Sequence, residues 1–403
     1  MQGTRARLRL TVLSLCVLGW ILDAKQPLQA QEGGVSASEI LIGGIGALTG
    51  PFAFIGAPGR DGLTLGFNEI NQQNVCGRKI RLLFEHASSP AENLAAAKKL
   101  VEQDRVFVLV LAGGSTGAAA AADYVRQVGV PTYNIFGSTP IIREPFAKNV
   151  FHGAIVRVEN SSLAMVDQVY DGQFRPRKLG VLAGTYAYPQ ALLQGVERAL
   201  KARNQDYVVE QFDQSARDFA SQLVAFSRQN VDAIMIIGSF SEAGFAIKQG
   251  REIGLGNVRW VVDSTATNTA IIPVLGNAEG LRGYYNAPYF PGQNVPAIRE
   301  FESRLKEQLG SMPQGRPNQY DMIGYGSAYV ITQAALATSC ELTRDRLIEA
   351  WSNLKEAGPV KLGGLDVGFP ESFTPTDHQG NKRLGGTIVK NGAWEVYRYI
   401  DGP

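Results

Sequence analysis

Short apolar runs alternate with longer helical patterns along this chain, in two successive series, and no other feature restricts its fold as strongly. The apolar runs of the first series are 39–46, 79–86, 106–111 and 130–136, with helical patterns near 58–73, 90–104 and 116–128. Those of the second series are 178–184, 207–212, 232–238 and 258–263, with helical patterns near 188–204, 216–230 and 241–253. Strands that alternate with helices form parallel sheets covered on both faces. The sequence therefore predicts an α/β fold with two parallel sheets.

The order of the patterns changes after residue 285. Three helical patterns lie near 295–309, 319–339 and 344–357, and two strand-like segments, 385–392 and 394–399, close the chain. A tail that follows two similar α/β halves has to cover both of them, and no low-complexity linker separates the halves. We therefore expect two lobes that share several crossovers rather than two independent domains.

Residues 1–30 have the pattern of a secretory signal peptide. Arg5, Arg7 and Arg9 precede a short apolar segment, and Ala30 offers a small residue for cleavage. That segment is too short to span a bilayer and no second long apolar segment follows, so we expect no membrane span after cleavage. Cleavage removes four of the 39 Lys and Arg residues and one of the 37 Asp and Glu residues, which leaves the mature chain nearly neutral. Because it lacks a basic block, we expect no binding to nucleic acid.

Cysteine and histidine usage bears on disulfides and metals. The mature chain keeps Cys76 and Cys340. Export permits a disulfide between them, but two distant cysteines cannot establish one, so a bridge and two free thiols both stay open. The three histidines are His86, His152 and His378. None has a zinc-type spacing with a cysteine, and the glycines of 43–50 miss the dinucleotide-binding spacing by one place, so we expect neither a metal nor another cofactor.

The segment VLVLAGGSTGAAAAADYV, residues 108–125, contains the motif G-x-S-x-G from Gly113 to Gly117. In serine hydrolases this motif places a nucleophile on a turn between a strand and a helix, with a histidine further along the chain. Ser115 followed by His378 would fit that order. However, a complete second α/β half follows the motif, and no HGGG-like segment supplies oxyanion donors before it. We therefore expect no enzyme and consider a hydrolase the weaker hypothesis.

The same turn suits the binding of an anion. The first N–H groups of a helix have no partners within the helix, and they attract a carboxylate together with the positive end of the helix dipole. Gly113 and Gly114 permit close approach of a ligand, while Ser115 and Thr116 add hydroxyl donors. A second turn, residues 137–140, follows the next predicted strand with Gly137, Ser138 and Thr139. Ligands of α/β sheets bind at the carboxyl ends of such neighbouring strands.

Six segments carry a resemblance to a known family. In the first half they are IGALTGP, INQQNVCGRKIRLLFEHASSPAENLAAAKKLVEQD and VPTYNIFGSTP, and later ones are YPQALLQGVERALK, VDAIMIIGSFSEAGFAIKQGREIGL and LTRDRLIEAWSNLK. In order and spacing they resemble the leucine/isoleucine/valine-type periplasmic binding proteins, which are the solute receptors of ABC importers. The likeness extends over essentially the whole mature chain.

The resemblance implies a type I periplasmic-binding fold, with two Rossmann-like lobes joined by three crossover strands. The first lobe would comprise 35–156 and 288–362, and the second 157–287 and 363–403. It also implies a monomeric receptor in the periplasm that binds a small carboxylate between its lobes and delivers it to an ABC permease. A ligand sensor without transport is an alternative.

Family positions map onto this sequence one by one. Gly113, Gly114, Ser115 and Thr116 match the first carboxylate-binding turn, and Gly137 and Thr139 match the second, beside Ser138. Tyr188 matches an aromatic residue of the second lobe that closes over the ligand. These matches predict the turns as the carboxylate end of the site.

The chain departs from the family pattern at the other end of the site. The family's ammonium-binding glutamate aligns near Ser264, so Asp263 would have to serve from the neighbouring position. Phe54 and Phe240 indicate a more apolar pocket. Two ligand classes therefore compete: a branched-chain or other aliphatic amino acid, which needs Asp263, and an aromatic or branched carboxylic acid, which does not.

Overall fold

All eight predicted apolar runs form strands in the computed structural model, which describes residues 32–402; the predicted signal peptide lies outside them. The strands of the first series are β1 (Glu39–Gly46), β2 (Lys79–His86), β3 (Val108–Leu111) and β4 (Thr132–Asn134). Those of the second are β6 (Lys178–Gly184), β7 (Asp206–Phe212), β8 (Ala233–Ile237) and β9 (Arg259–Val262). Two short strands that the sequence analysis did not name are β5 (Val150–His152) and β10 (Arg282–Tyr285).

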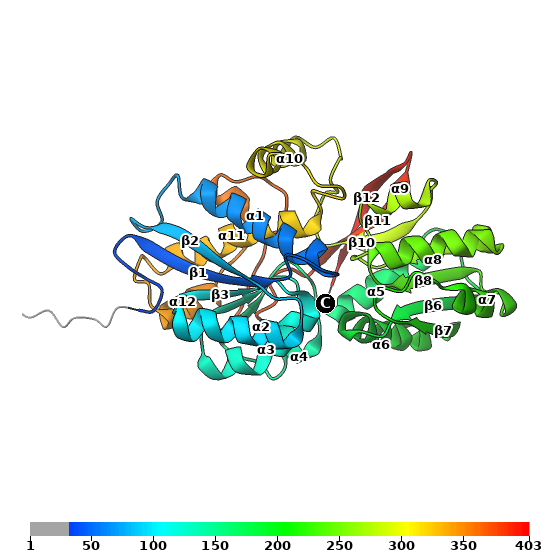
Figure 1. Cartoon of the computed structure of the whole chain (residues 1–403), viewed down its shortest axis with the longest axis horizontal. Coiled ribbons are helices and arrows are strands. Elements are labelled where there is room, and N and C mark those ends of the chain that lie inside the picture. Colours follow the sequence, from blue (N-terminus) through cyan, green and yellow to red (C-terminus); the bar gives the residue numbers. More distant parts are fainter. Residues whose placement is uncertain (1–31, 403) are drawn as a thin grey trace, which may run out of the picture. The chain divides into compact units, whose positions relative to one another are not determined.

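The strands form two separate sheets, which confirms the predicted fold class (Figure 1). The first is fully parallel, with the order β2-β1-β3-β4-β5. The second has the order β12-β11-β10-β9-β8-β6-β7. Its last two strands in the chain, β11 (Arg383–Lys390) and β12 (Ala393–Asp401), are antiparallel and come from the predicted closing segments.

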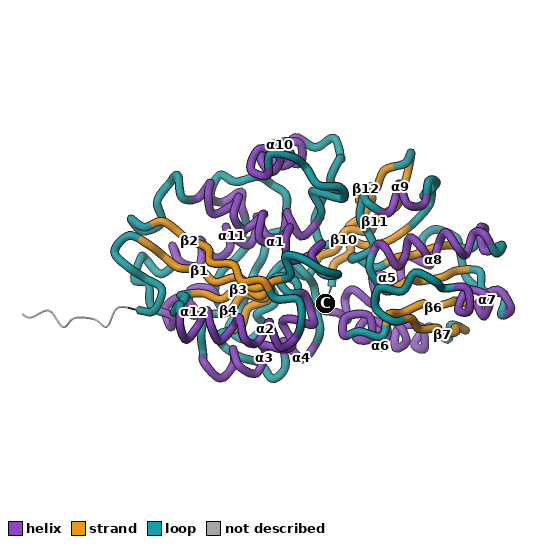
Figure 2. Tube along the Cα trace, viewed as in Figure 1, coloured by secondary structure: helices purple, strands orange, loops and turns teal. Residues whose placement is uncertain are grey.

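The helices divide between the sheets as the alternation predicts (Figure 2). With the first sheet lie α1 (Ala53–Ile70), α2 (Pro90–Lys98), α3 (Gly114–Val128) and α4 (Pro140–Arg143). With the second lie α5 (Val158–Val169), α6 (Ala187–Ala202), α7 (Ala220–Arg228), α8 (Phe240–Glu252) and α9 (Ile271–Leu275). The tail helices α10 (Pro296–Leu309), α11 (Gln319–Ala337) and α12 (Arg344–Trp351) return to the first group. Helix α1 begins before its predicted start, with Pro58 inside it.

We call the first sheet with α1–α4 and α10–α12 the first lobe, and the second sheet with α5–α9 the second lobe. The chain passes between the lobes three times, after β5, after β10 and before β11. This agrees with the expected shared crossovers. The residue boundaries given above for the lobes stay a prediction.

The central strands β3 and β8 are buried on both faces, because successive side chains point to opposite sides of a sheet and helices cover both sides. Val108 and Val110 of β3 belong to the cluster that includes α1 and α11, whereas Leu109 and Leu111 pack with α2 and α3. The second sheet repeats this pattern with α7 and α8 on one face and α5 and α6 on the other. Figure 1 shows helices above and below the first sheet. Such continuous apolar runs are typical of parallel strands.

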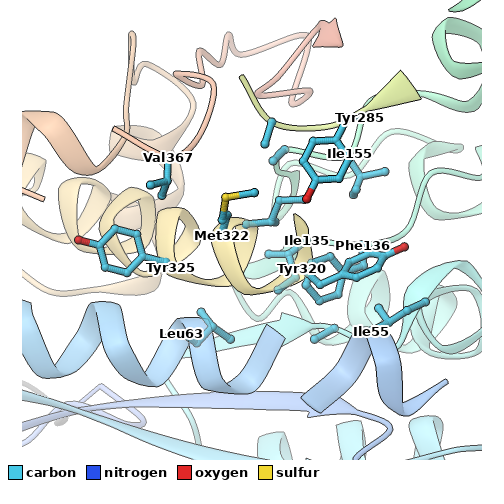
Figure 3. Packing of buried hydrophobic residues seen from close by; sticks show 14 of the residues in the cluster. Ile55, Leu63, Ile135, Phe136, Ile155, Tyr285, Tyr320, Met322, Tyr325 and Val367 are labelled. Carbon is cyan, nitrogen blue, oxygen red and sulfur yellow. The ribbon is translucent and has the colours of Figure 1, made fainter. Parts of the chain in front are cut away.

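Helices α1 and α11 pack closely along their length (Figure 3). Gly62 of α1 faces the backbone of Asp321 on α11, where a Cβ atom would lie 2.0 Å from the carbonyl oxygen. Each helix is followed by a turn that carries a cysteine, and Cys76 and Cys340 form a disulfide with a Cα–Cα distance of 5.4 Å. Of the two alternatives left open by the sequence, the structure therefore contains the bridge.

Glu371, a buried residue of the passage that leads to β11, gives the first testable prediction. The Tyr133 hydroxyl donates a hydrogen bond to its carboxyl group. Burial raises the pKa of Glu371 from 4.5 to about 8, although the hydrogen bond from Tyr133 lowers it. Because the folded state holds this proton more tightly than the unfolded state, the contribution of Glu371 to stability should fall as pH rises between these two values.

The Glu371→Gln variant should remove that part of the pH dependence, measured as the free energy of unfolding in urea across this range. Glu349, which is exposed on α12, offers a matched control. Glu349→Gln should leave the profile of the parent unchanged. If the profiles of the two variants coincide, Glu371 does not titrate as stated.

Candidate functional site

A cavity lies between the lobes at the carboxyl ends of strands from both sheets. Its walls come from the turns after β1, β3 and β4 in the first lobe, and from those after β6, β7, β8 and β9 in the second. The space open to the centre of a water molecule is about 70 Å³. The carboxyl edge of a parallel sheet is where α/β proteins bind ligands.

The predicted first turn lines this cavity through residues 113–116. Gly113 is the N-cap of α3, and no side chain caps the helix. The N–H groups of Gly114, Ser115 and Thr116 have no acceptor among the described residues. A carboxylate placed there would meet several free donors and the positive end of a helix of 15 residues.

Local packing accounts for the three glycines of the G-x-S-x-G motif. A Cβ atom on Gly113 or Gly117 would lie 2.5 or 2.4 Å from Asn93 Oδ1 of α2. Gly114 has a φ of +66°, a conformation that strongly favours glycine. The motif therefore arises from the contact between α2 and α3 and from the backbone of the turn.

Ser115 joins the two predicted turns. Its side chain is buried, and its Oγ accepts a hydrogen bond of 3.1 Å from the N–H of Ser138. Ser138 also lines the cavity, and its Oγ is buried without a hydrogen-bond partner among the described residues. A buried polar atom without a partner is rare and requires an explanation.

Gly137 and Thr139 lie in the second turn but do not line the cavity. The N–H of Gly137 donates to Asn134 Oδ1, and its carbonyl accepts from Asn134 Nδ2. Thr139 Oγ1 is buried and, like Ser138 Oγ, has no partner among the described residues. Arg143 donates weakly to the carbonyls of Gly137 and Thr139, at 3.3 and 3.5 Å. The structure therefore brings Ser138, rather than its two neighbours, to the cavity.

Two tyrosines of the second lobe line the cavity beside β6. The Tyr188 hydroxyl lies 2.8 Å from that of Tyr284, so Tyr188 presents its ring to the cavity. Tyr186 donates a hydrogen bond of 3.0 Å to Oε2 of Glu242, which also lines the cavity. The Glu242 carboxylate accepts from the N–H groups of Ser215 and Ser239 as well. The cavity therefore has an acidic end in the second lobe.

Asp263 is fully buried behind the cavity wall rather than part of it. One carboxylate oxygen accepts from the N–H of Gly238, and the other from the N–H and hydroxyl groups of Thr265. Burial raises the pKa of Asp263 to about 7, although these hydrogen bonds lower it. Its neighbours Ser264 and Thr265 line the cavity instead. Asp263 thus organises the turn after β9.

Aromatic rings make up much of the remaining wall. Four further aromatic residues line the cavity: Phe52, Phe54 and Phe136 come from the region around α1 and β4, and Tyr320 comes from α11. Figure 3 shows Phe136, Tyr320 and Ile55 side by side at one end of α1. Phe240 does not line this cavity; its ring packs edge-to-face on Phe54 with centroids 5.8 Å apart.

Several groups that would support other chemistry are missing from this part of the structure. No residue that lines the cavity is a lysine, an arginine or a histidine. Within residues 32–402, Ser115 has no hydrogen bond to a histidine, and no three His, Cys, Asp or Glu side chains gather as a metal site would require. No helix in the same range is long and apolar enough to cross a membrane.

Several residues that line the cavity were not predicted from the sequence. Tyr186, Ser264 and Thr265 all lie within a few positions of the carboxyl end of a strand, which is a signal that would have selected them. Glu242 was not predicted as a cavity residue because its sequence pattern is that of a helix cap: it closes the capping box of α8 with Ser239. Tyr320 had no local signal, because only the return of the chain through α11 brings it to the cavity.

The fold and the cavity define a two-lobed solute-binding protein with the type I periplasmic-binding fold. A family model described as "Periplasmic binding protein" matches residues 39–393. The chain therefore belongs to the periplasmic binding protein family, as its sequence segments predict. This family comprises solute-binding proteins of ABC transporters, which confirms the predicted general class.

Three comparisons illustrate the relationship. The Leu/Ile/Val-binding protein homolog 1 of Brucella abortus (strain 2308) is 22% identical over 378 residues, covering 91% of this chain and 95% of the relative. A leucine binding protein from Thermotoga maritima has a TM-score of 0.76 at 20% identity, covering 90% of this chain and 99% of that one. A solute binding protein of an ABC transporter from Rhodopseudomonas palustris BisB5 was solved with 3,4-dihydroxybenzoic acid. It has a TM-score of 0.75 at 21% identity, covering 90% of this chain and 98% of that one.

Proposed function

We propose that this protein is an exported receptor that binds a small carboxylate with an aromatic or other apolar body and delivers it to an ABC permease. Ser138 has an unpartnered, buried hydroxyl and lines the same cavity as the start of α3 with its free N–H groups, and this is the observation that carries the proposal. These donors would hold the carboxylate, and the aromatic walls would cover the rest of the ligand. Binding, not hydrolysis, is then the role of Ser115.

The walls of the cavity favour a carboxylic acid over an aliphatic amino acid. An ammonium group needs an acceptor that faces it, and the oxygens of Asp263 are occupied by the turn after β9. The ligand of the similar solute binding protein from Rhodopseudomonas palustris BisB5, 3,4-dihydroxybenzoic acid, belongs to the proposed class.

An α-amino acid is the second candidate, and Glu242 is the observation that favours it. Its carboxylate lines the cavity in the lobe opposite α3, at a place where an ammonium group could pair with it. The leucine binding protein from Thermotoga maritima represents this ligand class among the solved structures. A phenolic hydroxyl of an aromatic acid could donate to Glu242 equally well, so Glu242 alone does not separate the two classes.

Ser138→Ala gives the second prediction. The hydroxyl has no partner to lose within the described chain, so the free energy of unfolding without ligand should not fall, because removal of a buried hydroxyl that makes no hydrogen bond relieves its desolvation cost. Affinity for a carboxylate ligand should fall by at least tenfold, because a hydrogen bond to a charged group contributes about 1.5–3 kcal/mol. Isothermal titration calorimetry measures the affinity.

Thr139→Val is the matched control, since Thr139 Oγ1 is equally buried and unpartnered but does not face the cavity. It should leave the affinity unchanged. Equal losses in both variants would place Thr139 in the site too, and no loss in either would remove the second turn from it.

A thermal-shift screen of residues 31–403, after removal of ligand carried over from expression, tests the proposed function. The panel contains aromatic carboxylates, aliphatic α-amino acids, their deaminated acids and uncharged amides. A ligand at a hundredfold excess over its Kd stabilises the folded state by about 2.7 kcal/mol, which gives a clear shift of the melting temperature. Stabilisation by aromatic acids supports the proposal; stabilisation by amino acids but not by their deaminated forms supports the second candidate. Stabilisation by amides alone would contradict both.

A further inference from the structure

A second cavity lies directly beyond the wall of the ligand cavity. It is bounded by Ala53, Ala57 and Pro58 of α1, by Asn268 in the second lobe, and by the loop that contains Arg316 and Asn318. We call it the outer cavity. Phe54 lines both cavities, and no other residue of the range 32–402 does. In the outer cavity about 260 Å³ is open to the centre of a water molecule, compared with about 70 Å³ in the ligand cavity.

The ring of Phe54 forms the partition between the two cavities. It packs edge-to-face against Phe240 of the second lobe at 5.8 Å and against Tyr320 of α11 at 6.0 Å between centroids. Phe240 lines only the outer cavity and Tyr320 only the ligand cavity. Phe54 is only half-buried. The partition between the two cavities is therefore one side chain thick.

The outer cavity suits an apolar group better than a second charge. Arg316 is engaged by Asp61 at 2.8 Å and by Asp321. The side-chain oxygens of Asn268 and Asn318 accept hydrogen bonds from the N–H groups of Ala270 and Tyr320. These polar groups already have partners, whereas the alanines, Pro58 and the two phenylalanine rings offer an apolar surface.

From this geometry we infer that Phe54 sets the length of ligand that the receptor accepts, and that the outer cavity is a subsite for the apolar tail of a longer carboxylic acid. The inference rests on the proposed function, because it needs a carboxylate held by α3. A short acid ends at the Phe54 ring. A longer one has to displace the ring from Phe240 and Tyr320 before its tail enters the outer cavity.

A series of phenylalkanoic acids with increasing numbers of methylene groups tests the inference by calorimetry. In the parent protein we expect affinity to drop by about tenfold at the length that reaches Phe54, which is the scale of one or two lost ring contacts. Phe54→Ala should abolish this drop, so that the longer acids bind at least as tightly as the shorter ones. Phe240→Ala opens the partition from the other side and should shift the profile in the same direction.

Phe52→Ala is the matched control. Phe52 lines only the ligand cavity and packs on Tyr186 at 6.3 Å, so its loss should weaken every acid of the series to a similar extent. Identical length profiles for Phe54→Ala and Phe52→Ala would overturn the inference. If the parent binds all acids of the series without a drop in affinity, the proposed function stands and the inference is overturned. If no variant binds any acid, both are overturned.

Discussion

Replacing Arg316 with methionine should lower the free energy of unfolding by about 3–5 kcal/mol, because it leaves the buried carboxylate of Asp321 without a cation and removes one of the two ion pairs of Asp61. Arg316 Nη1 lies 2.8 Å from Asp61 Oδ2, and its Nε and Nη2 donate to Asp321. The side chains of Asp61 and Asp321 are 6% and 0% exposed. Asp61 keeps a second ion pair with Arg60, but Asp321 has no other cation within the described residues.

The pH dependence of this loss identifies its cause. Burial raises the pKa of Asp321, while its hydrogen bond and ion pair with Arg316 lower it. Without Arg316 the principal opposing effect is gone, so the variant should lose more stability as pH rises and regain part of it as pH falls. Urea unfolding at about pH 5 and about pH 8 measures the difference.

Arg304→Met is the control for Arg316→Met. Arg304 also bridges two acids, Glu69 and Glu300, but its side chain is 37% exposed. A solvent-exposed ion pair contributes only about 0–1 kcal/mol, so this variant should remain close to the parent. Similar losses in the two variants would show that the buried position of Arg316 does not control the effect.

Removing the disulfide should cost about 2–5 kcal/mol. The bridge joins Cys76 and Cys340, which are 264 positions apart, so it closes a long loop and restricts the unfolded chain. It also connects the turns that follow α1 and α11, the two helices that form the closest helix pair of the first lobe. We therefore expect the double variant Cys76→Ser, Cys340→Ser to unfold at a lower urea concentration.

Reduction of the parent protein provides the comparison for the double variant. Dithiothreitol should lower the unfolding midpoint of the parent toward that of the variant and leave the variant unchanged. The disulfide follows the C-terminal ends of α1 and α11, whereas the ligand cavity lies at their N-terminal ends. The affinity for a ligand should therefore be retained in the variant. A stability loss below about 1 kcal/mol would mean that the chain gains little from closing this loop.

The fold class could be predicted from the sequence because its signal, the alternation of apolar and helical segments, is local. The run KLGVLAG predicts a buried strand by itself, and Lys178–Gly184 forms β6 with these limits. Ser89 and Glu92 predict the start of α2, and both form the capping box found there. The short strand β5 was missed because its three residues give no period of their own, and its position depends on pairing with β4.

The cavity residues, like the fold, could be predicted only where their sequence signal is local. The sequence by itself determined the first-lobe turns of residues 113–116 and 138, because a turn that follows a buried strand has to reach the carboxyl edge of a sheet. Only the tertiary structure decided that Asp263 turns inward, that Glu242 and Tyr186 face the cavity, and that Phe54 separates two cavities. Those facts depend on contacts between the loops that follow neighbouring strands of the second lobe, such as Tyr186 with Glu242 and Gly238 with Asp263, and on the contacts of Phe54 with Phe240 and Tyr320. These contacts join residues far apart in the chain, and no local pattern records them.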